Sequence, residues 1–343
     1  MCDTILFRKY GEETLTTFPY RLDTKRYHTF NYHLKQHFNE KVFKVALDAG
    51  FDCPNRDGTV AYGGCTFCSV AGSGDFAGDR VDPIPVQFEK IKNKMHSQKW
   101  KDGQYIAYFQ SFTNTHAPLH ILKEKFEAAL AIDGVVGLSI GTRPDCLPDD
   151  VVEYLAELNT RTYLWVELGL QTIHESTSRL INRAHTMDVY YEGVKKLRAH
   201  HINVCTHIIN GLPLEDTQMM METAEAVAQM DVQGIKIHLL HLLKKTPMVK
   251  QYEKGMLEFL SKDEYIALVV NQLRALPPEM IIHRITGDGP IDQLIGPMWS
   301  VDKWDVLNSI DRALEKEDIY QGDRFEVNEN AKPYIATREI SRW

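Results

Sequence analysis

Seven short runs of β-branched and apolar residues alternate with segments of helical periodicity along most of this chain. The runs lie at 41–50, 105–110, 135–142, 162–171, 203–213, 234–243 and 280–289, and the helical segments lie near 86–98, 119–132, 149–159, 188–200, 216–230 and 262–275. Strands separated by helices of about 10 to 15 residues are typical of βαβ units and a parallel sheet. The pattern therefore predicts an α/β fold with a partial (β/α) barrel, whose functional groups follow the carboxyl ends of the strands.

The two ends of the chain fall outside this alternation. Residues 1–40 form an N-terminal extension rich in basic and aromatic residues, the barrel is expected over 41–290, and 291–343 form a C-terminal extension. The stretch DKWDVLNSIDRALEKED at 302–318 has helical periodicity. We expect both ends to cap the open barrel rather than to form separate domains.

Composition and charge restrict the class of protein. The chain has 343 residues, of which 43% are hydrophobic and 25% charged, and this balance is typical of a soluble globular protein. The formal net charge of −8 argues against a protein that coats nucleic acid non-specifically. Neither a membrane-spanning run nor a secretory signal is recognisable, so we expect a cytoplasmic location and reduced cysteines.

Positive charge is nevertheless concentrated in two stretches. Residues 20–44 carry six Lys or Arg against two acids, with three histidines and six aromatic residues interleaved, and VQFEKIKNKMHSQKWK at 86–101 carries five Lys against one Glu. One interpretation is that both stretches are solvated surfaces. The other is a local footprint for an RNA backbone with stacking aromatic side chains.

Three cysteines lie close together after the first predicted strand, in the stretch CPNRDGTVAYGGCTFC. Their spacing is Cys53-x11-Cys65-x2-Cys68, whereas the other three, Cys2, Cys146 and Cys205, are scattered singly. Structural zinc normally takes four ligands, so a zinc site here would need a histidine as its fourth. Three thiolates suit a [4Fe–4S] cluster with one iron open to a non-protein ligand. Cys146 and Cys205 are interpreted as small buried side chains.

Several motifs resemble those of the radical S-adenosylmethionine (SAM) superfamily. These are CTFC at 65–68, SIGTRPDCL at 139–147, ELGLQTIHESTSRLINRAHT at 167–186 and IINGLP at 208–213. The long first cysteine spacing is similar to that of the Elongator-type branch, and the whole chain looks close to a bacterial subfamily that lacks an acetyltransferase domain. The resemblance implies a partial (β/α)6-type TIM barrel of the radical SAM kind. It also implies that a [4Fe–4S] cluster reductively cleaves SAM to a 5′-deoxyadenosyl radical.

The resemblance carries over to individual residues. Cys53, Cys65 and Cys68 match the cluster ligands, and the implied SAM-binding positions are Phe67, Ser111, Thr113, Asn114, Gln171, Arg183, Ile209, Gly211 and Pro213. The chain departs from relatives at Gly141 and His207, where many have an acid that contacts the cofactor.

The substrate expectation also follows from the resemblance. The Elongator-type branch acts on C5 of the tRNA wobble uridine, which suggests conversion of carboxymethylaminomethyluridine to aminomethyluridine. The side chains expected to face the substrate are Glu167, His207, Lys236, His238, His241, Lys244 and Arg284. The implied partners are tRNA and a reduced electron donor such as flavodoxin or ferredoxin. Two alternatives stay open: a radical SAM enzyme for a small molecule such as a porphyrin precursor, and a non-catalytic zinc module that binds RNA.

Overall fold

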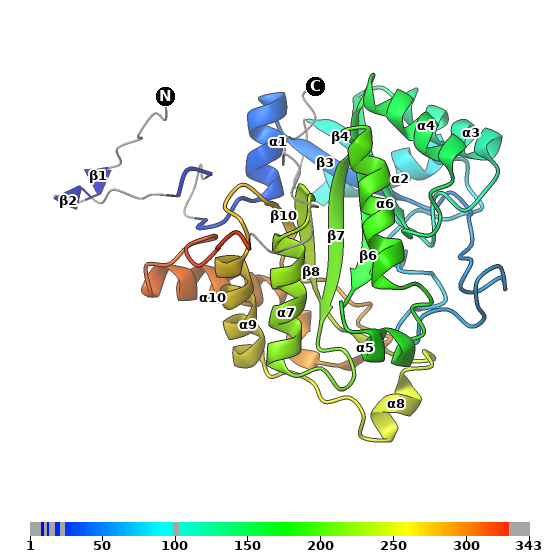
Figure 1. The fold of residues 1–343 in the computed structure, drawn as a ribbon. Coiled ribbons are helices and arrows are strands. Elements are labelled where there is room, and N and C mark those ends of the chain that lie inside the picture. Colours follow the sequence, from blue (N-terminus) through cyan, green and yellow to red (C-terminus); the bar gives the residue numbers. More distant parts are fainter. Residues whose placement is uncertain (1–7, 10–11, 14–17, 21–24, 99–102, 329–343) are drawn as a thin grey trace.

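The computed structural model describes residues 8–9, 12–13, 18–20, 25–98 and 103–328. Its main sheet consists of β3 (Val42–Leu47), β4 (Gln104–Phe109), β5 (Val135–Thr142), β6 (Tyr163–Gln171), β7 (Asn203–Asn210), β8 (Gly234–Leu239) and β10 (Ile281–Arg284). The strands are parallel and stand side by side in the order of the sequence, from β3 at one edge to β10 at the other. The seven predicted runs each overlap one of these strands, and the predicted partial barrel is confirmed (Figure 1).

Helices cover the outer face of the sheet (Figure 1). They are α2 (Ile84–Gln98), α3 (Leu119–Leu130), α4 (Asp149–Asn159), α6 (Met187–Ala199), α7 (Thr217–Ala228) and α9 (Lys262–Ala275), and each of the six predicted helical segments lies on one of them. Alternate strand residues such as Val45 and Leu47 are fully buried in the apolar layer between sheet and helices. Their neighbours Lys44 and Ala46 face the other side of the sheet, where a cavity lies.

The described part of the C-terminal extension, 291–328, lies against the barrel. A short strand, β9 (Leu242–Leu243), pairs antiparallel with β11 (Leu294–Gly296), a 3-10 helix, η1 (Met298–Val301), follows, and α10 (Lys303–Lys316) lies against α9. Short helices α5 (Glu175–Leu180) and α8 (Val249–Glu253) follow β6 and β9. Near the N-terminus, β1 (Arg8–Lys9) and β2 (Glu12–Glu13) form a separate antiparallel pair.

The helix α1 (Phe30–Phe38) contacts both edge strands, β3 and β10, and thereby spans the gap between them. The ring of Phe30 stacks on His283 at 4.0 Å between centroids and meets Trp165 edge-on at 5.9 Å. Tyr27 and Phe30 are therefore buried. Neither ring is therefore exposed on the outer surface, where an RNA footprint would lie, and Phe30 instead lines the interior cavity. Residues 21–24 and 99–102 of the two basic stretches lie outside the described residues.

None of the helices formed by the described residues combines the length and apolar character needed to cross a lipid bilayer. The buried core instead lies between the sheet and its surrounding helices.

Candidate active site

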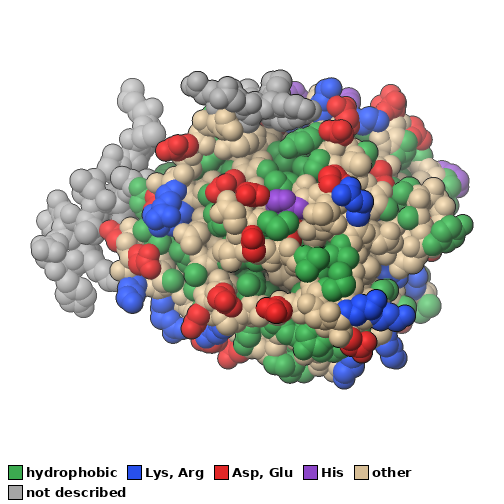
Figure 2. Space-filling model, turned by 60° about the horizontal axis from the view of Figure 1, so that its bottom comes forward, with side chains coloured by type: hydrophobic (Ala, Val, Ile, Leu, Met, Phe, Trp, Pro, Cys, Tyr) green, Lys and Arg blue, Asp and Glu red, His purple; other side chains and the backbone are tan. Residues whose placement is uncertain are grey.

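A cavity of about 510 Å³ lies inside the open barrel and reaches the carboxyl ends of its strands. Each strand of the main sheet contributes lining residues, including Lys44, Tyr108, Gly141, Glu167, Gln171, His207, Ile209, Lys236, His238 and Arg284. Most are spaced two apart along a strand, because successive side chains of a strand point to opposite faces. Figure 2 views this end of the molecule, where acidic and hydrophobic side chains surround a histidine near the middle.

The three cysteines of the CPNRDGTVAYGGCTFC loop line this cavity together. The loop begins with a tight turn in which the amides of Arg56 and Asp57 donate to the carbonyl of Cys53, at 2.7 and 3.1 Å. It then passes through Gly63 and Gly64, whose φ angles of 82° and 74° favour glycine. The turn and the glycines return the chain so that Cys65 and Cys68 meet Cys53 at one cavity wall.

The loop is fixed to the segment after β6 by two asparagines. Asn182 donates from its side chain to the carbonyls of Tyr62 and Gly64, at 3.1 and 2.9 Å. Asn55 donates to the carbonyl of Asn182 at 2.6 Å and to the Sγ of Cys65 at 3.5 Å. The positions of the thiols therefore depend on contacts between two distant parts of the sequence.

The donor set fits a [4Fe–4S] cluster. Burial and the neighbouring Cys68 thiol raise the pKa of Cys65 to about 12, so a thiolate at this position requires a bound cation. Among the described residues no three His, Cys, Asp or Glu side chains gather closely enough to hold a single metal ion. A cluster does not need that arrangement, because each thiolate binds a different iron. The hydrogen bond from Asn55 to Cys65 is of the kind that tunes such clusters.

Four of the residues expected to bind SAM, Phe67, Thr113, Gln171 and Ile209, line the cavity beside the cysteines. Gln171 ends β6 with a positive φ of 63°. Its amide lies over Gly169, where an added Cβ would stand 2.5 Å from Gln171 Nε2. Glycine at 169 therefore leaves room for the Gln171 side chain at the cavity wall.

Other expected SAM-binding residues, Ser111, Asn114, Gly211 and Pro213, do not belong to the cavity lining. The Asn114 amide nitrogen donates to the carbonyls of Phe109, Ser111 and Gly141, which joins β4 to β5. Ser111 has a buried Oγ with no hydrogen-bond partner among the described residues. Gly211 has a φ of 87°, which permits the turn after β7.

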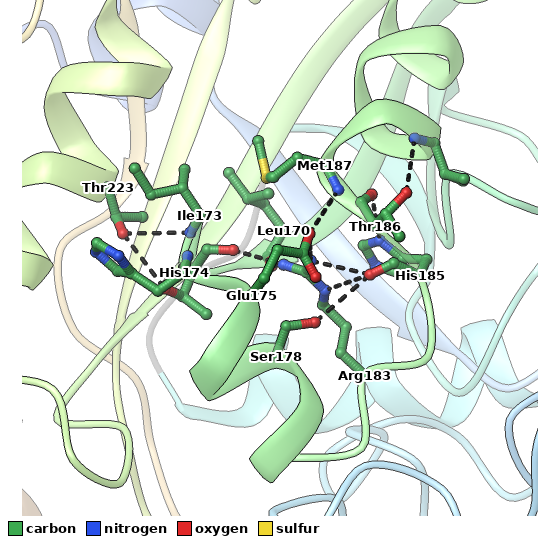
Figure 3. A network of polar contacts seen from close by, with 12 residues as sticks. Leu170, Ile173, His174, Glu175, Ser178, Arg183, His185, Thr186, Met187 and Thr223 are labelled. Atoms are coloured by element: carbon green, nitrogen blue, oxygen red, sulfur yellow. Dashed lines mark hydrogen bonds and ion pairs between the residues drawn. The ribbon is translucent and has the colours of Figure 1, made fainter.

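Arg183 is also outside the cavity lining, although it was expected to bind the SAM carboxylate. Its buried guanidinium donates to the carbonyls of Leu170 at 2.6 Å, of Thr172, and of His185 at 2.9 and 3.1 Å (Figure 3). Arg183 therefore stabilises the connection between β6 and α6. The side chain that this connection itself brings to the cavity is His185. Arg143, which also lines the cavity, donates to the main-chain carbonyl of Arg183 at 2.9 Å.

Deeper in the barrel, Glu167 is the centre of a polar network. Its carboxylate accepts from Lys44 at 2.6 Å, from His207 at 2.8 Å and also from Lys236 and Ser139. Lys236 donates in addition to the hydroxyl of Tyr108, at 3.0 Å. Four strands, β3, β5, β7 and β8, thus direct polar groups at one buried carboxylate on β6.

Burial and charge set the protonation states in this network. Burial opposes ionisation of Glu167, but Lys236, Lys44 and His207 outweigh it and hold its pKa well below the usual value. Burial and the positive charge of Lys236 lower the pKa of His207 to about 4. Burial lowers the pKa of Lys236 to about 8. Near neutral pH the network therefore contains a carboxylate, charged lysines and a neutral histidine.

Six of the residues expected to face the substrate, Glu167, His207, Lys236, His238, His241 and Arg284, line the cavity. The seventh, Lys244, is exposed and donates to the carbonyl of Asp292 at 2.9 Å, away from the lining. His207 stands where many relatives have an acid, and in this fold its ring is hydrogen-bonded to the carboxylate of Glu167. Gly141 also lines the cavity, and an added Cβ there would lie 3.2 Å from the carbonyl of Phe109.

Sequence reasoning missed Lys44 and Tyr108 as site residues. Lys44 interrupts the apolar run VFKVAL of β3, and a charge inside such a buried strand is itself a signal of an interior polar site. Tyr108 carries no comparable signal, because tyrosine is common in strands.

Comparisons with known proteins assign the family. The model of the Radical SAM superfamily matches residues 53–227, and that of the Radical_SAM C-terminal domain matches 232–316. The uncharacterized protein YtqA of Bacillus subtilis is 72% identical over 309 residues, which are 90% of this chain and 96% of that protein. The Elongator complex protein 3 of Mus musculus is 28% identical over 161 residues, which are 46% of this chain and 28% of that protein.

Among solved structures, Elp3 of the archaeon Methanocaldococcus infernus has a similar fold. The TM-score is 0.62 at 14% identity, over 82% of this chain and 64% of that chain. Together with the three-thiol loop and the partial barrel, these matches show that the chain belongs to the radical SAM superfamily, whose enzymes use a [4Fe–4S] cluster and SAM, and that it is related to the radical SAM part of the Elongator protein.

Proposed function

We propose that this radical SAM enzyme modifies the C5 substituent of the wobble uridine in tRNA, converting carboxymethylaminomethyluridine to aminomethyluridine. The observation that carries the proposal is a single cavity in which the cysteine loop overlies a positively charged inner layer containing Lys44, Lys236 and Arg284. Such a cavity suits a substrate with an anionic end. The relationship to Elongator protein 3 supports the choice of tRNA.

A bound [4Fe–4S] cluster and SAM would supply one-electron cleavage of SAM and abstraction of a hydrogen atom from the substrate. The chain's own part begins with Cys53, Cys65 and Cys68, which would hold the cluster, while Gln171 and Thr113, which line the same cavity, would position SAM. The surrounding barrel would exclude water from the reaction. A reduced flavodoxin or ferredoxin would deliver the electron.

The depth of the cavity agrees with a modified base as substrate. The cavity extends from the cysteine loop, where the cluster and SAM would lie, down to the inner layer. Bases in single-stranded loops can be splayed out and inserted into a pocket. The C5 substituent would then be the group that reaches the inner layer, since it projects beyond the ring.

The test is the wobble-nucleoside profile of tRNA from a deletion strain. Mass spectrometry should show that carboxymethylaminomethyluridine accumulates and that aminomethyluridine is lost. A plasmid with the wild-type gene should restore the parental profile, and one with Cys65→Ala should not. An unchanged profile in the deletion strain would refute the proposal.

A further inference from the structure

The inner layer of the cavity carries more positive than negative charge. Lys44 and Lys236 pair with Glu167, and Arg284 lines the same cavity, so three cations accompany one carboxylate and a net charge of about +2 remains. The histidines do not change this sum, because burial lowers the pKa of His207 and of His241 to about 4 and that of His238 well below its usual value. Asp288, at the same cavity, is paired with Lys303 at 2.5 Å.

The excess positive charge of the inner layer lies apart from the cysteine loop. Lys44 stands three residues before the end of β3, and Glu167 four residues before the end of β6. At about 3.3 Å per residue, Lys44 and Glu167 are roughly 10 to 13 Å below the ends of their strands. Arg284 is the last residue of β10, but it is the register partner of Lys236, which stands three residues before the end of β8. A ligand of the inner layer is therefore a different group from the cluster.

The geometry of β10 brings two cations together. In the parallel pairing of β8 with β10, Arg284 is the register partner of Lys236, and like charges in such positions repel. The register shifts between Ile282 and Arg284, and the consecutive residues His283 and Arg284 both line the cavity. Irregularities of this kind re-aim side chains, often beside active sites.

The hydrogen-bonding capacity of these cations is only partly used. Each lysine ammonium has three donors. Lys44 bonds to Ser139 and Glu167, and Lys236 bonds to Tyr108 and Glu167. Arg284 makes no hydrogen bond or ion pair with any residue in the described part of the chain, so its guanidinium fork is available to a ligand.

We infer that Arg284, supported by Lys44 and Lys236, binds the carboxylate of the substrate's C5 substituent and selects substrates that carry it. A guanidinium can bind a carboxylate bidentately, which fixes both its position and its orientation. Glu167 forms ion pairs with both lysines and so offsets the repulsion between them. The inference rests on the proposed function, because it names the group that the same cavity recognises.

The experiment uses reconstituted holoenzyme and three anticodon stem-loops that differ only at the wobble uridine. One carries the carboxymethylaminomethyl group, the second its uncharged methyl ester and the third the aminomethyl group. Dissociation constants are measured for the wild type, Arg284→Gln and Arg284→Lys, and SAM binding is measured for each. Arg312→Gln, at an exposed position of α10, is the matched control.

The wild type and Arg312→Gln should bind the carboxylate stem-loop about 10 to 100 times more tightly than the ester, as expected for a hydrogen-bonded charge. Arg284→Gln should lose this preference with unchanged SAM affinity, and Arg284→Lys should keep part of it. If Arg284→Gln keeps the full preference, or loses SAM affinity instead, the inference is overturned while the proposed function stands. If the wild type converts the carboxylate stem-loop without preferring it over the ester, only the inference fails. If the wild type neither binds nor converts any stem-loop, the proposed function fails and the inference falls with it.

Discussion

At the scale of single residues, Glu167 connects the charged side chains inside the barrel. It is buried, and it lies between two ammonium groups that would otherwise face each other across the cavity. Removing one partner of a buried ion pair leaves an uncompensated charge. The Glu167 carboxylate is therefore expected to be essential for stability as well as for the shape of the site.

We expect Glu167→Ala to lower the free energy of unfolding by about 3 to 5 kcal/mol, measured by urea denaturation. The control is Glu225→Ala, since Glu225 is exposed on α7 and should change stability by less than about 0.5 kcal/mol. Equal effects of the two substitutions would contradict the role assigned to Glu167.

Lys236 gives a prediction about pH. Burial lowers its pKa from 10.5 to about 8 in the folded protein, so between pH 8 and 10 the unfolded chain retains a proton that the folded protein has lost. Stability rises with pH wherever the unfolded state binds more protons. The free energy of unfolding contributed by this group should therefore increase over that interval.

The comparison is between the wild type and Lys236→Met, denatured in urea at several pH values from 7 to 10. As pH rises, the free energy of unfolding of the wild type should increase relative to that of Lys236→Met. A difference that does not vary with pH would show that Lys236 keeps an ordinary pKa.

Some site residues could be predicted from the sequence, and the contacts of others could not. The three cysteines and Glu167 were predicted at the cavity, because their motif spacing or strand position assigned them. Arg183 matched its motif equally well, yet its guanidinium bonds to main-chain carbonyls. A motif identifies a residue by its position in the sequence. The partners of a long side chain such as that of Arg183 also depend on which main-chain carbonyls the fold leaves without a hydrogen-bond donor.

At the scale of elements, the connection between β6 and α6 joins the two halves of the site. Arg183 donates to the carbonyls of Leu170 in β6 and of Thr172 and His185 in the connection (Figure 3). Asn182 beside it binds the cysteine loop. The connection is thus expected to keep both the cluster loop and His185 in place.

We expect Arg183→Gln to increase amide hydrogen exchange in residues 172–187 about 10- to 100-fold, because buried carbonyls lose a charged donor. The control is Arg179→Gln, since Arg179 is exposed on α5. If exchange in this segment is as slow as in the control, Arg183 does not hold the connection together.

Elements with strong periodicity were predicted well, and short ones were not. The seven strands and six covering helices followed from alternation, and the α10 helix from its apolar spacing. The helix α1 was missed because its histidines and aromatic residues resemble a surface pattern, while in the fold they pack against Trp165 and His283. Its burial depends on the gap between β3 and β10, which no local pattern reveals.

At the scale of the whole molecule, the barrel combines a thiol-bearing loop at its rim with a positively charged layer in its interior. Lys and Arg lie mostly toward the periphery of the face in Figure 2, so the positive charge nearest the reaction is inside the cavity. Under the proposed function, affinity for the tRNA backbone is then expected to come from the periphery and selectivity from the interior.

The most direct test of the central claim uses purified, reconstituted enzyme with SAM, a reductant and tRNA from the deletion strain. We predict that aminomethyluridine forms at the wobble position together with 5′-deoxyadenosine. Cys65→Ala should fold, lack the brown iron–sulfur colour and form neither product. Cleavage of SAM by the wild type with no change in the wobble nucleoside would contradict the account.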